Sequence, residues 1–347
     1  MKTRAAILWS LNKPLIIDNV EIPALKRGQV LVKVLYSGIC RAQYNEIIGL
    51  KGPDKFLPHL LGHEASGHIV DAGPGITKVK KGDYVCLSWI KGEGLDGLNA
   101  QYRLNGKIIN AGAVTTFSDY TVVSENRVTK IVKSMPADAA AILGCAVLTG
   151  CGIMDHTLTA AKGSSIAVFG VGGIGLSVVL GAKRRGCATI LAVDIDDKKL
   201  MFARRLGATQ IINAAKKDFK EQALRLCPGG FDYAVDASGN KAAMEAAFAL
   251  VRERGGMCVI AGNLGKDEQI ALHPFDLIKG KRIMGTWGGE SWPDKDIPSY
   301  VRSFSKGQLP FAQMITHRFD LEHINKAFNV LVAGGAGRII LKVDNGQ

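Results

Sequence analysis

The chain has 347 residues, more than one typical domain, and 47% of them are hydrophobic, enough to form a substantial core. Lysine and arginine exceed the acidic residues by 44 − 31 = 13, but this excess is spread along the chain, with no basic tail and no nucleic-acid-binding motif. This composition excludes a disordered chain, and we expect no nucleic-acid partner.

Export and membrane insertion are not expected either. Residues 1–21 carry scattered charges and lack the apolar run of a signal peptide. Residues 163–182 are uncharged and long enough to span a bilayer, but their glycines fit a turn between a strand and a helix better. The seven cysteines are scattered and form no C-x-x-C pair, which favours a reducing cytoplasm over a disulfide framework.

The amino-terminal part is predicted to be mostly β. Short apolar runs at 5–9, 15–17 and 30–36 are separated by turn signals containing proline or glycine. The third run leads to Cys40, and Gly62-His63-Glu64 follows 23 residues after that cysteine. Residues 114–123 are predicted to return to strand, and residues 138–154 to form a helix that breaks near the glycines at 150 and 152.

Cys40, His63 and Cys145 are candidate zinc ligands. Zinc prefers nitrogen and sulfur donors, and a catalytic site with two cysteines and one histidine keeps a fourth position open. The other buried cysteines and the scattered histidines are interpreted as small apolar residues and as hydrogen-bonded side chains. This interpretation covers Cys86, Cys187, Cys258, His156, His273, His317 and His323.

A dinucleotide-binding fingerprint lies at 165–194. A β-branched run at 165–169 enters a glycine-rich turn, a helical stretch follows to residue 186, and an apolar run ends at Asp194. Gly170 permits the tight turn, Gly172 lets a pyrophosphate approach the backbone, and Gly175 allows close helix–strand packing. Gly173 and Ile174 complete the turn.

Asp194 predicts NAD as the cofactor. It lies 19 residues after Gly175, where a carboxylate receives the ribose hydroxyls. The same charge repels the additional 2′-phosphate of NADP, and no arginine follows it directly.

The rest of the chain predicts a doubly wound parallel sheet followed by a return to the first part. Apolar runs at 231–236, 256–262 and 282–287 alternate with helical segments such as 198–206 and 241–252. After residue 288 we expect helices at 300–306 and 321–332 and a last strand at 338–343.

Together these motifs resemble the zinc-dependent medium-chain alcohol dehydrogenases. The likeness rests on Gly62-His63-Glu64 with Cys40, on 143–150 around Cys145, on the glycine turn, and on Gly337-Arg338. It implies an α/β protein with a Rossmann doubly wound parallel sheet and a mostly β, GroES-like catalytic domain. The catalytic domain is expected at 1–145 and 289–347, and the NAD-binding domain at 146–288.

The resemblance also implies roles for single residues. Glu64 lies beside the metal and approaches it when the fourth ligand exchanges. Thr149 borders the nicotinamide, and Lys199 belongs to the cofactor site. Arg41 and Arg338 contact the pyrophosphate, a role that suits the paired donors of a guanidinium group.

The sequence departs from the family pattern in two places. Residues 88–107 contain none of the four cysteines that hold a structural zinc in relatives, so we expect one zinc per chain and a loop over the pocket mouth. Ala42 stands where relatives carry the serine or threonine that relays the alcohol proton, and Gln43 stands where an acid is frequent. His59 and Tyr44 are alternative proton carriers.

The predicted function is hydride transfer between an alcohol and NAD, giving an aldehyde or ketone. Alternatives are a non-catalytic NAD-binding sensor or structural protein, an enzyme that recycles tightly bound NAD within one turnover, and the zinc-free quinone or enone reductase branch. The substrate is predicted to be a polyol, a sugar or a phosphorylated alcohol. Trp89 and Ala42 are expected to line the pocket, with basic residues in its loop at 91, 103 and 107. A homodimer or homotetramer is expected to form through residues 283–287.

Overall fold

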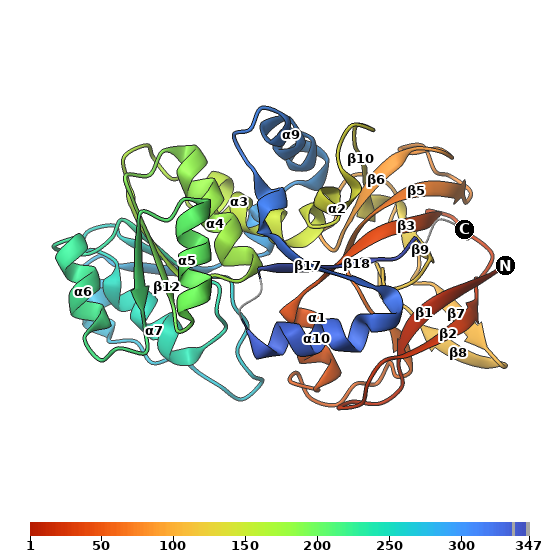
Figure 1. Cartoon of the computed structure of the whole chain (residues 1–347), viewed down its shortest axis with the longest axis horizontal. Coiled ribbons are helices and arrows are strands. Elements are labelled where there is room, and N and C mark those ends of the chain that lie inside the picture. The colour runs from red at the N-terminus through yellow and green to blue at the C-terminus, as the bar shows by residue number, and fades with distance from the viewer. Residues whose placement is uncertain (335–336, 345–347) are drawn as a thin grey trace.

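The computed structural model describes residues 1–334 and 337–344 and contains three sheets (Figure 1). The first sheet is a closed barrel of short strands at the amino-terminal end of the molecule. Around the barrel, neighbouring strands follow the order β1 (Lys2–Leu8), β2 (Ile16–Glu21), β7 (Gln101–Leu104), β8 (Lys107–Asn110) and β4 (His59–Leu60).

The second sheet joins the two ends of the chain. Its order is β10 (Val128–Lys130), β6 (Tyr84–Ser88), β5 (Glu64–Ala72), β3 (Gln29–Ile39), β18 (Arg338–Lys342) and β17 (Ile315–Asp320), and β9 (Tyr120–Ser124) also pairs with β3. Because β18 pairs antiparallel with β3, it brings Arg338 opposite the end of the strand that leads into Cys40.

The third sheet is the predicted doubly wound parallel sheet. Its order is β13 (Gln210–Asn213), β12 (Thr189–Asp194), β11 (Ser165–Phe169), β14 (Tyr233–Asp236), β15 (Met257–Ile260) and β16 (Arg282–Gly285), with every pairing parallel. This is the Rossmann order, which reverses beside the first strand and leaves a crevice there. The fold prediction is confirmed.

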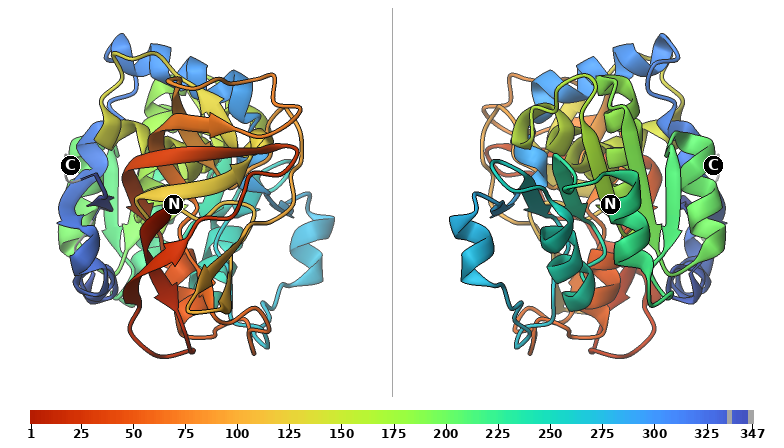
Figure 2. Two further views of the ribbon diagram at one scale, coloured as in Figure 1. Left: turned by 90° about the vertical axis from the view of Figure 1, so that its right-hand side faces the viewer. Right: turned by 90° about the vertical axis from the view of Figure 1, so that its left-hand side faces the viewer.

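Helices cover both faces of the parallel sheet, as the end view in Figure 2 shows. Along β11, Ile166 and Val168 pack with residues of α4 (Gly173–Arg185) and α5 (Asp197–Leu206). Ala167 and Phe169 point to the opposite face and pack with α6 (Phe219–Leu226) and α7 (Lys241–Leu250). This strand is therefore apolar on both faces, as a buried parallel strand requires.

The remaining helical segments connect the sheets and cover them. The α-helices are α1 (Arg41–Ile47), α2 (Ala137–Ala140), α3 (Leu148–Gly152), α8 (Pro274–Ile278), α9 (Pro293–Ser305) and α10 (Ile324–Ala333). Two π-helical turns, η2 (Leu143–Val147) and η3 (Ile153–Thr157), flank α3. The 3₁₀ turns are η1 (Glu125–Arg127), η4 (Gly288–Glu290), η5 (Phe311–Met314) and η6 (Leu321–His323). Within the described residues, no helix combines the length and the apolar character needed to cross a bilayer.

Three element predictions were wrong in their details. The expected loop at 88–107 contains β7 and the start of β8, which form a hairpin around Asn105-Gly106, both with positive φ. That dipeptide is a strong hairpin signal. The chain at 138–154 does not break at its glycines but widens into π turns on either side of them. The helix expected at 300–306 begins earlier, at Pro293, because proline is well tolerated in a first helical turn.

Candidate active site

Three separate segments bring the predicted metal ligands together. Cys40 is the N-cap of α1 at the end of β3, His63 follows β4, and Cys145 lies in the π turn η2. One ligand atom from each residue lies within 4.8 Å of the others. We call these three residues the Cys2His cluster. π turns are frequent at functional sites because they displace one side chain from the regular helical register, and here that side chain is Cys145.

The electrostatics of the Cys2His cluster suit a cation. The pKa of Cys40 lies well below that of an ordinary thiol, first because the Cys145 thiol donates to it and then because of His63. The pKa of Cys145 is raised by the same contact and by burial. His63 Nε2 is buried and has no hydrogen-bond partner within the described chain. A thiolate, a second sulfur and an open imidazole nitrogen match the donor set of a catalytic zinc.

Gln43 holds two members of the cluster in place. Its Oε1 accepts a hydrogen bond from the Cys40 backbone N–H at 2.9 Å, and its Nε2 lies 2.6 Å from His63 Nδ1. The amide is almost fully buried. Its two contacts fix the imidazole ring relative to the start of α1.

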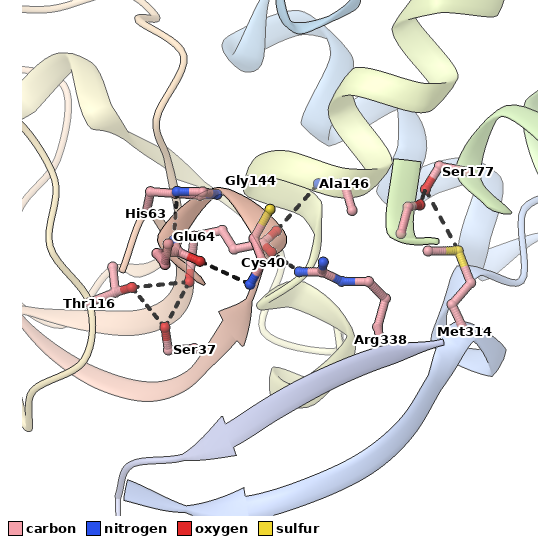
Figure 3. A network of polar contacts seen from close by, with 12 residues as sticks. Ser37, Cys40, His63, Glu64, Thr116, Gly144, Ala146, Ser177, Met314 and Arg338 are labelled. Carbon is pink, nitrogen blue, oxygen red and sulfur yellow. Dashed lines mark hydrogen bonds and ion pairs between the residues drawn. The ribbon is translucent and has the colours of Figure 1, made fainter. Parts of the chain in front are cut away.

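Glu64 and Arg338 form a buried ion pair close to Cys40 (Figure 3). Glu64 is fully buried and pairs with Arg338, and its other oxygen lies 3.4 Å from the Ala146 backbone N–H. Arg338 also lies against Gly173, where an added Cβ would be 2.7 Å from the Arg338 Cδ. Burial lowers the pKa of Arg338, and the neighbouring Cys40 opposes that shift. The structure thus places Arg338 between the cluster and the first turn of α4.

The glycine turn has the geometry that its sequence predicts. Gly170 has a φ of +80°, a conformation that L side chains rarely adopt. A Cβ on Gly175 would lie 1.9 Å from the Gly170 carbonyl oxygen, so only glycine fits this contact. A Cβ on Gly172 would meet no atom of the described residues within 4 Å, so the backbone there has free space beside it at the start of α4. Such a helix N-terminus can receive a phosphate group.

The other predicted cofactor residues lie on four different elements. Asp194, at the end of β12, accepts hydrogen bonds from the Val171 N–H at 2.9 Å and the Ile195 N–H at 2.8 Å. The Thr149 hydroxyl, in α3, is buried and has no partner within the described residues. Lys199 lies in the first turn of α5, whereas Arg41 is exposed with its guanidinium group 5.5 Å from the centre of the Tyr44 ring.

Trp89 lies beside the Cys145 thiol and packs edge-on against Trp287, with ring centres 5.0 Å apart. The basic residues expected near the substrate have other neighbours. The Lys91 ammonium group pairs with Asp96. Arg103 lies opposite Glu21 between two barrel strands, and Lys107 lies over the Trp9 ring. The described residues therefore offer no cluster of these basic side chains to an anionic substrate.

A cavity of about 400 Å³ opens beside His63. We call it the His63 cavity. Its wall includes Gln43, Glu46, Asp54, His59, His63 and Thr115. Glu46, Asp54 and His59 form a second group whose ligand atoms lie within 4.8 Å of one another. Sequence reasoning named only His59 here, because Glu46 and Asp54 belong to no motif and meet through the loop that follows α1.

Comparison with known proteins agrees with this arrangement. Residues 26–133 match the alcohol dehydrogenase GroES-like domain, and residues 173–306 match the zinc-binding dehydrogenase domain. A class-3 alcohol dehydrogenase from Oryza sativa subsp. japonica is 32% identical, covering 98% of this chain and 97% of the relative. An S-(hydroxymethyl)glutathione dehydrogenase from Aspergillus oryzae is also 32% identical, with 98% and 96% covered.

Solved structures give the same result. An alcohol dehydrogenase zinc-binding domain protein from Burkholderia ambifaria superimposes with a TM-score of 0.92 at 28% identity, covering 99% of this chain and 100% of the other. The benzyl alcohol dehydrogenase of Acinetobacter calcoaceticus gives 0.90 at 26%, with the same coverage. The chain therefore belongs to the zinc-type medium-chain alcohol dehydrogenase family and is an alcohol dehydrogenase, an enzyme of alcohol and aldehyde oxidoreduction.

Proposed function

We propose that this alcohol dehydrogenase oxidises its alcohol with one zinc ion and NAD. The observation that carries the proposal is the Cys2His cluster, whose three ligand atoms converge beside a cavity and next to the glycine turn. Bound to Cys40, His63 and Cys145, zinc supplies Lewis-acid activation of the alcohol oxygen, and NAD accepts the hydride. Glu64 remains a candidate for transient approach to the metal.

Residues of the protein position the zinc ion and NAD relative to each other. Gly170, Gly172 and Gly175 shape the turn for the pyrophosphate, and Arg338, with the exposed Arg41, supplies positive charge beside it. The Thr149 hydroxyl, which has no partner among the described residues, is assigned to the nicotinamide side, and Lys199 to the adenosine side. We assign catalysis to residues 1–145 and 289–347, and cofactor binding to residues 146–288.

NAD is proposed over NADP because of Asp194. Its carboxylate accepts three backbone N–H groups at the end of β12, which hold it where the fingerprint expects the ribose. The negative charge of Asp194 would repel a 2′-phosphate at that place. Turnover efficiency should therefore be higher with NAD, and an equal or higher efficiency with NADP would contradict the assignment.

One zinc per chain is proposed because residues 88–107 contain no cysteine. Part of that segment forms the β7–β8 hairpin, whose backbone pairing stabilises a region that a structural zinc stabilises in relatives.

The alcohols to test as substrates are polyols and sugars as the polar class and aromatic alcohols as the apolar class.

A metal and activity assay tests the proposal. Wild-type protein should bind one zinc per chain and form NADH on mixing with NAD and a panel of alcohols. Cys145→Ser should lose the zinc and at least about 100-fold in activity, because catalytic zinc requires its full set of three protein ligands. Cys227→Ser, which removes a thiol remote from the cluster, is the matched control and should keep both. Zinc-free wild-type protein with full activity would overturn the proposal.

A homodimer or homotetramer is proposed through the β16 edge of the parallel sheet. This strand is largely exposed, and apolar side chains of α8 and of residue 287 lie beside it in the sequence and are also exposed. Exposed apolar surface next to an unpaired strand edge favours association between copies of one chain.

A further inference from the structure

Oxidation of an alcohol releases a proton as well as a hydride, and the structure restricts which side chain can accept it. The ionisable residues that line the His63 cavity are Glu46, Asp54, His59 and His63. His63 belongs to the Cys2His cluster. Ala42, in the first turn of α1, has no group that can carry a proton. The candidates are therefore the other three ionisable residues of the cavity wall.

Two of these three residues are already engaged. His59 is buried, and its Nδ1 lies 2.9 Å from the Leu60 carbonyl oxygen while its Nε2 lies 2.8 Å from Asp54 Oδ2. Neither ring nitrogen is open to a substrate. The other oxygen of Asp54 accepts the Phe56 backbone N–H at 2.8 Å. His59 and Asp54 thus contact each other on the cavity wall, and these contacts reduce their capacity to accept the alcohol proton.

Glu46 differs from both neighbours. Its Oε1 lies 3.9 Å from His59 Nε2, beyond hydrogen-bond distance, so within the described chain its carboxylate keeps full capacity to accept a proton. Glu46 lies four residues after Ala42 on α1, and residues at this spacing lie on one helix face. Its side chain is 45% exposed, which leaves a path for the proton from the cavity to solvent.

We propose that Glu46 is the general base that takes the alcohol proton, directly or through water in the His63 cavity. The hydride leaves the carbinol carbon with its electron pair for the nicotinamide, the O–H proton passes to the Glu46 carboxylate, and the carbonyl double bond forms. Glu46 then releases the proton to solvent. The inference rests on the proposed oxidation of an alcohol with a nicotinamide cofactor.

The charges around Glu46 support this role. Loss of water contact raises its pKa, and the negative charge of Asp54 raises it further, while His59, Lys51 and His63 act in the opposite direction. The net shift is upward, toward the range in which a base works best at physiological pH. Oxidation needs the carboxylate form, so its rate should rise with pH through this raised pKa. Aldehyde reduction needs the acid form, so its rate should fall over the same range.

Glu46→Gln tests the inference with the shape of the side chain preserved. We expect kcat for oxidation to fall by about 100-fold or more, within the range that a positioned general base contributes, and the acidic limb of its pH profile to disappear. Glu46→Ala should be rescued by formate, which can enter the vacated space. Glu21→Gln, an exposed carboxylate of β2, is the charge-matched control and should keep the wild-type profile. A Glu46→Gln enzyme that keeps the acidic limb, or an alanine variant that formate does not rescue, would overturn the inference.

A second readout does not depend on turnover and separates this inference from the function on which it rests. Infrared spectra of wild type and Glu46→Gln are recorded at several pH values. The difference between them isolates the carboxyl band of Glu46. The inference requires that band to titrate over the same pH range as the acidic limb of the oxidation profile, and a band that titrates outside that range overturns it even in an active enzyme. A wild type that oxidises no alcohol would refute the proposed function instead. If Glu46→Gln does not fold, Glu46→Asp should keep the acidic limb at reduced kcat, and an unchanged kcat would contradict the proposal.

Discussion

The side-chain amide of Gln43 contacts one hydrogen-bond donor and one acceptor, the Cys40 N–H and the unprotonated Nδ1 of His63. Its oxygen accepts the Cys40 N–H, and its NH₂ group faces His63 Nδ1, so a neutral imidazole in this arrangement carries its proton on Nε2. Metal binding through Nε2 requires the proton on Nδ1 with an oxygen opposite it. Rotating the amide provides that oxygen but turns its NH₂ group against the Cys40 N–H. Gln43 therefore satisfies only one of its two neighbours once the metal is bound.

Gln43→Glu should remove this conflict. A carboxylate accepts from the Cys40 N–H and from His63 Nδ1 at once, and it adds a negative charge behind the imidazole. We expect zinc affinity to increase by about 10- to 100-fold, the usual effect of a partner that orients a metal ligand. Competition with a chromophoric chelator measures it. Gln101→Glu adds the same charge on the wall of the His63 cavity and should leave the affinity unchanged, whereas an unchanged affinity in Gln43→Glu would refute the argument.

At the scale of elements, two glycines of the cofactor turn should respond differently to the same substitution. Gly175→Ala places a Cβ 1.9 Å from the Gly170 carbonyl oxygen, so α4 must move away from β11, at a cost of about 1–3 kcal/mol of folding stability. The Cβ of Gly172→Ala meets no atom within 4 Å in the part of the chain that the structure describes, so stability should stay within about 1 kcal/mol of wild type. It should nevertheless weaken NAD binding by at least about 10-fold, because the Cβ occupies the path of the pyrophosphate.

Thermal unfolding and cofactor titration of the two variants separate these effects. Each variant is the control for the other, since both add one methyl group within a single turn. The assignment of the turn to the pyrophosphate would be refuted if Gly172→Ala bound NAD as tightly as wild type while remaining folded.

The sequence predicted the elements whose signals are local. The glycine turn, the parallel strands around it and a last strand near residue 338 were predicted from periodicity and turn residues, and all are present. The pairing of that last strand with β3 was not predicted. The β7–β8 hairpin was missed although Asn105-Gly106 marks it, because the flanking residues were interpreted as a glycine-rich loop. The π turn that carries Cys145 has no local signal, since it depends on how the helix packs between the two larger sheets.

The candidate site also contains residues that the sequence could predict and residues that it could not. Cys40, His63 and Cys145 could be predicted because metal chemistry restricts the residue types and the family pattern restricts their positions. Glu46 and Asp54 could not, because an acid in a helix or a loop is usually a solvated surface charge. Only the folded chain shows that they meet His59 at the cavity wall. The same holds for the Arg338–Glu64 pair, whose partners are 274 residues apart.

At the scale of the whole molecule, the β16 edge is the surface to test for self-association. Ile278 in α8 is 77% exposed and Trp287 is 73% exposed, while Met284 within the strand is 39% exposed. An edge strand with unpaired backbone groups and apolar neighbours can pair with its copy across a two-fold axis and continue the sheet. Such pairing would bury these side chains together.

Light scattering coupled to size-exclusion chromatography tests this pairing. The wild type should elute as a dimer or tetramer of the 37.1 kDa chain. Ile278→Asp and Met284→Asp should each shift it toward the monomer, because an unpaired carboxylate buried in an apolar interface costs several kcal/mol. Leu98→Asp changes a residue that is 72% exposed and remote from this edge in the sequence, so it should keep the wild-type mass. A monomeric wild type, or edge variants that stay fully oligomeric, would place any interface elsewhere on the molecule.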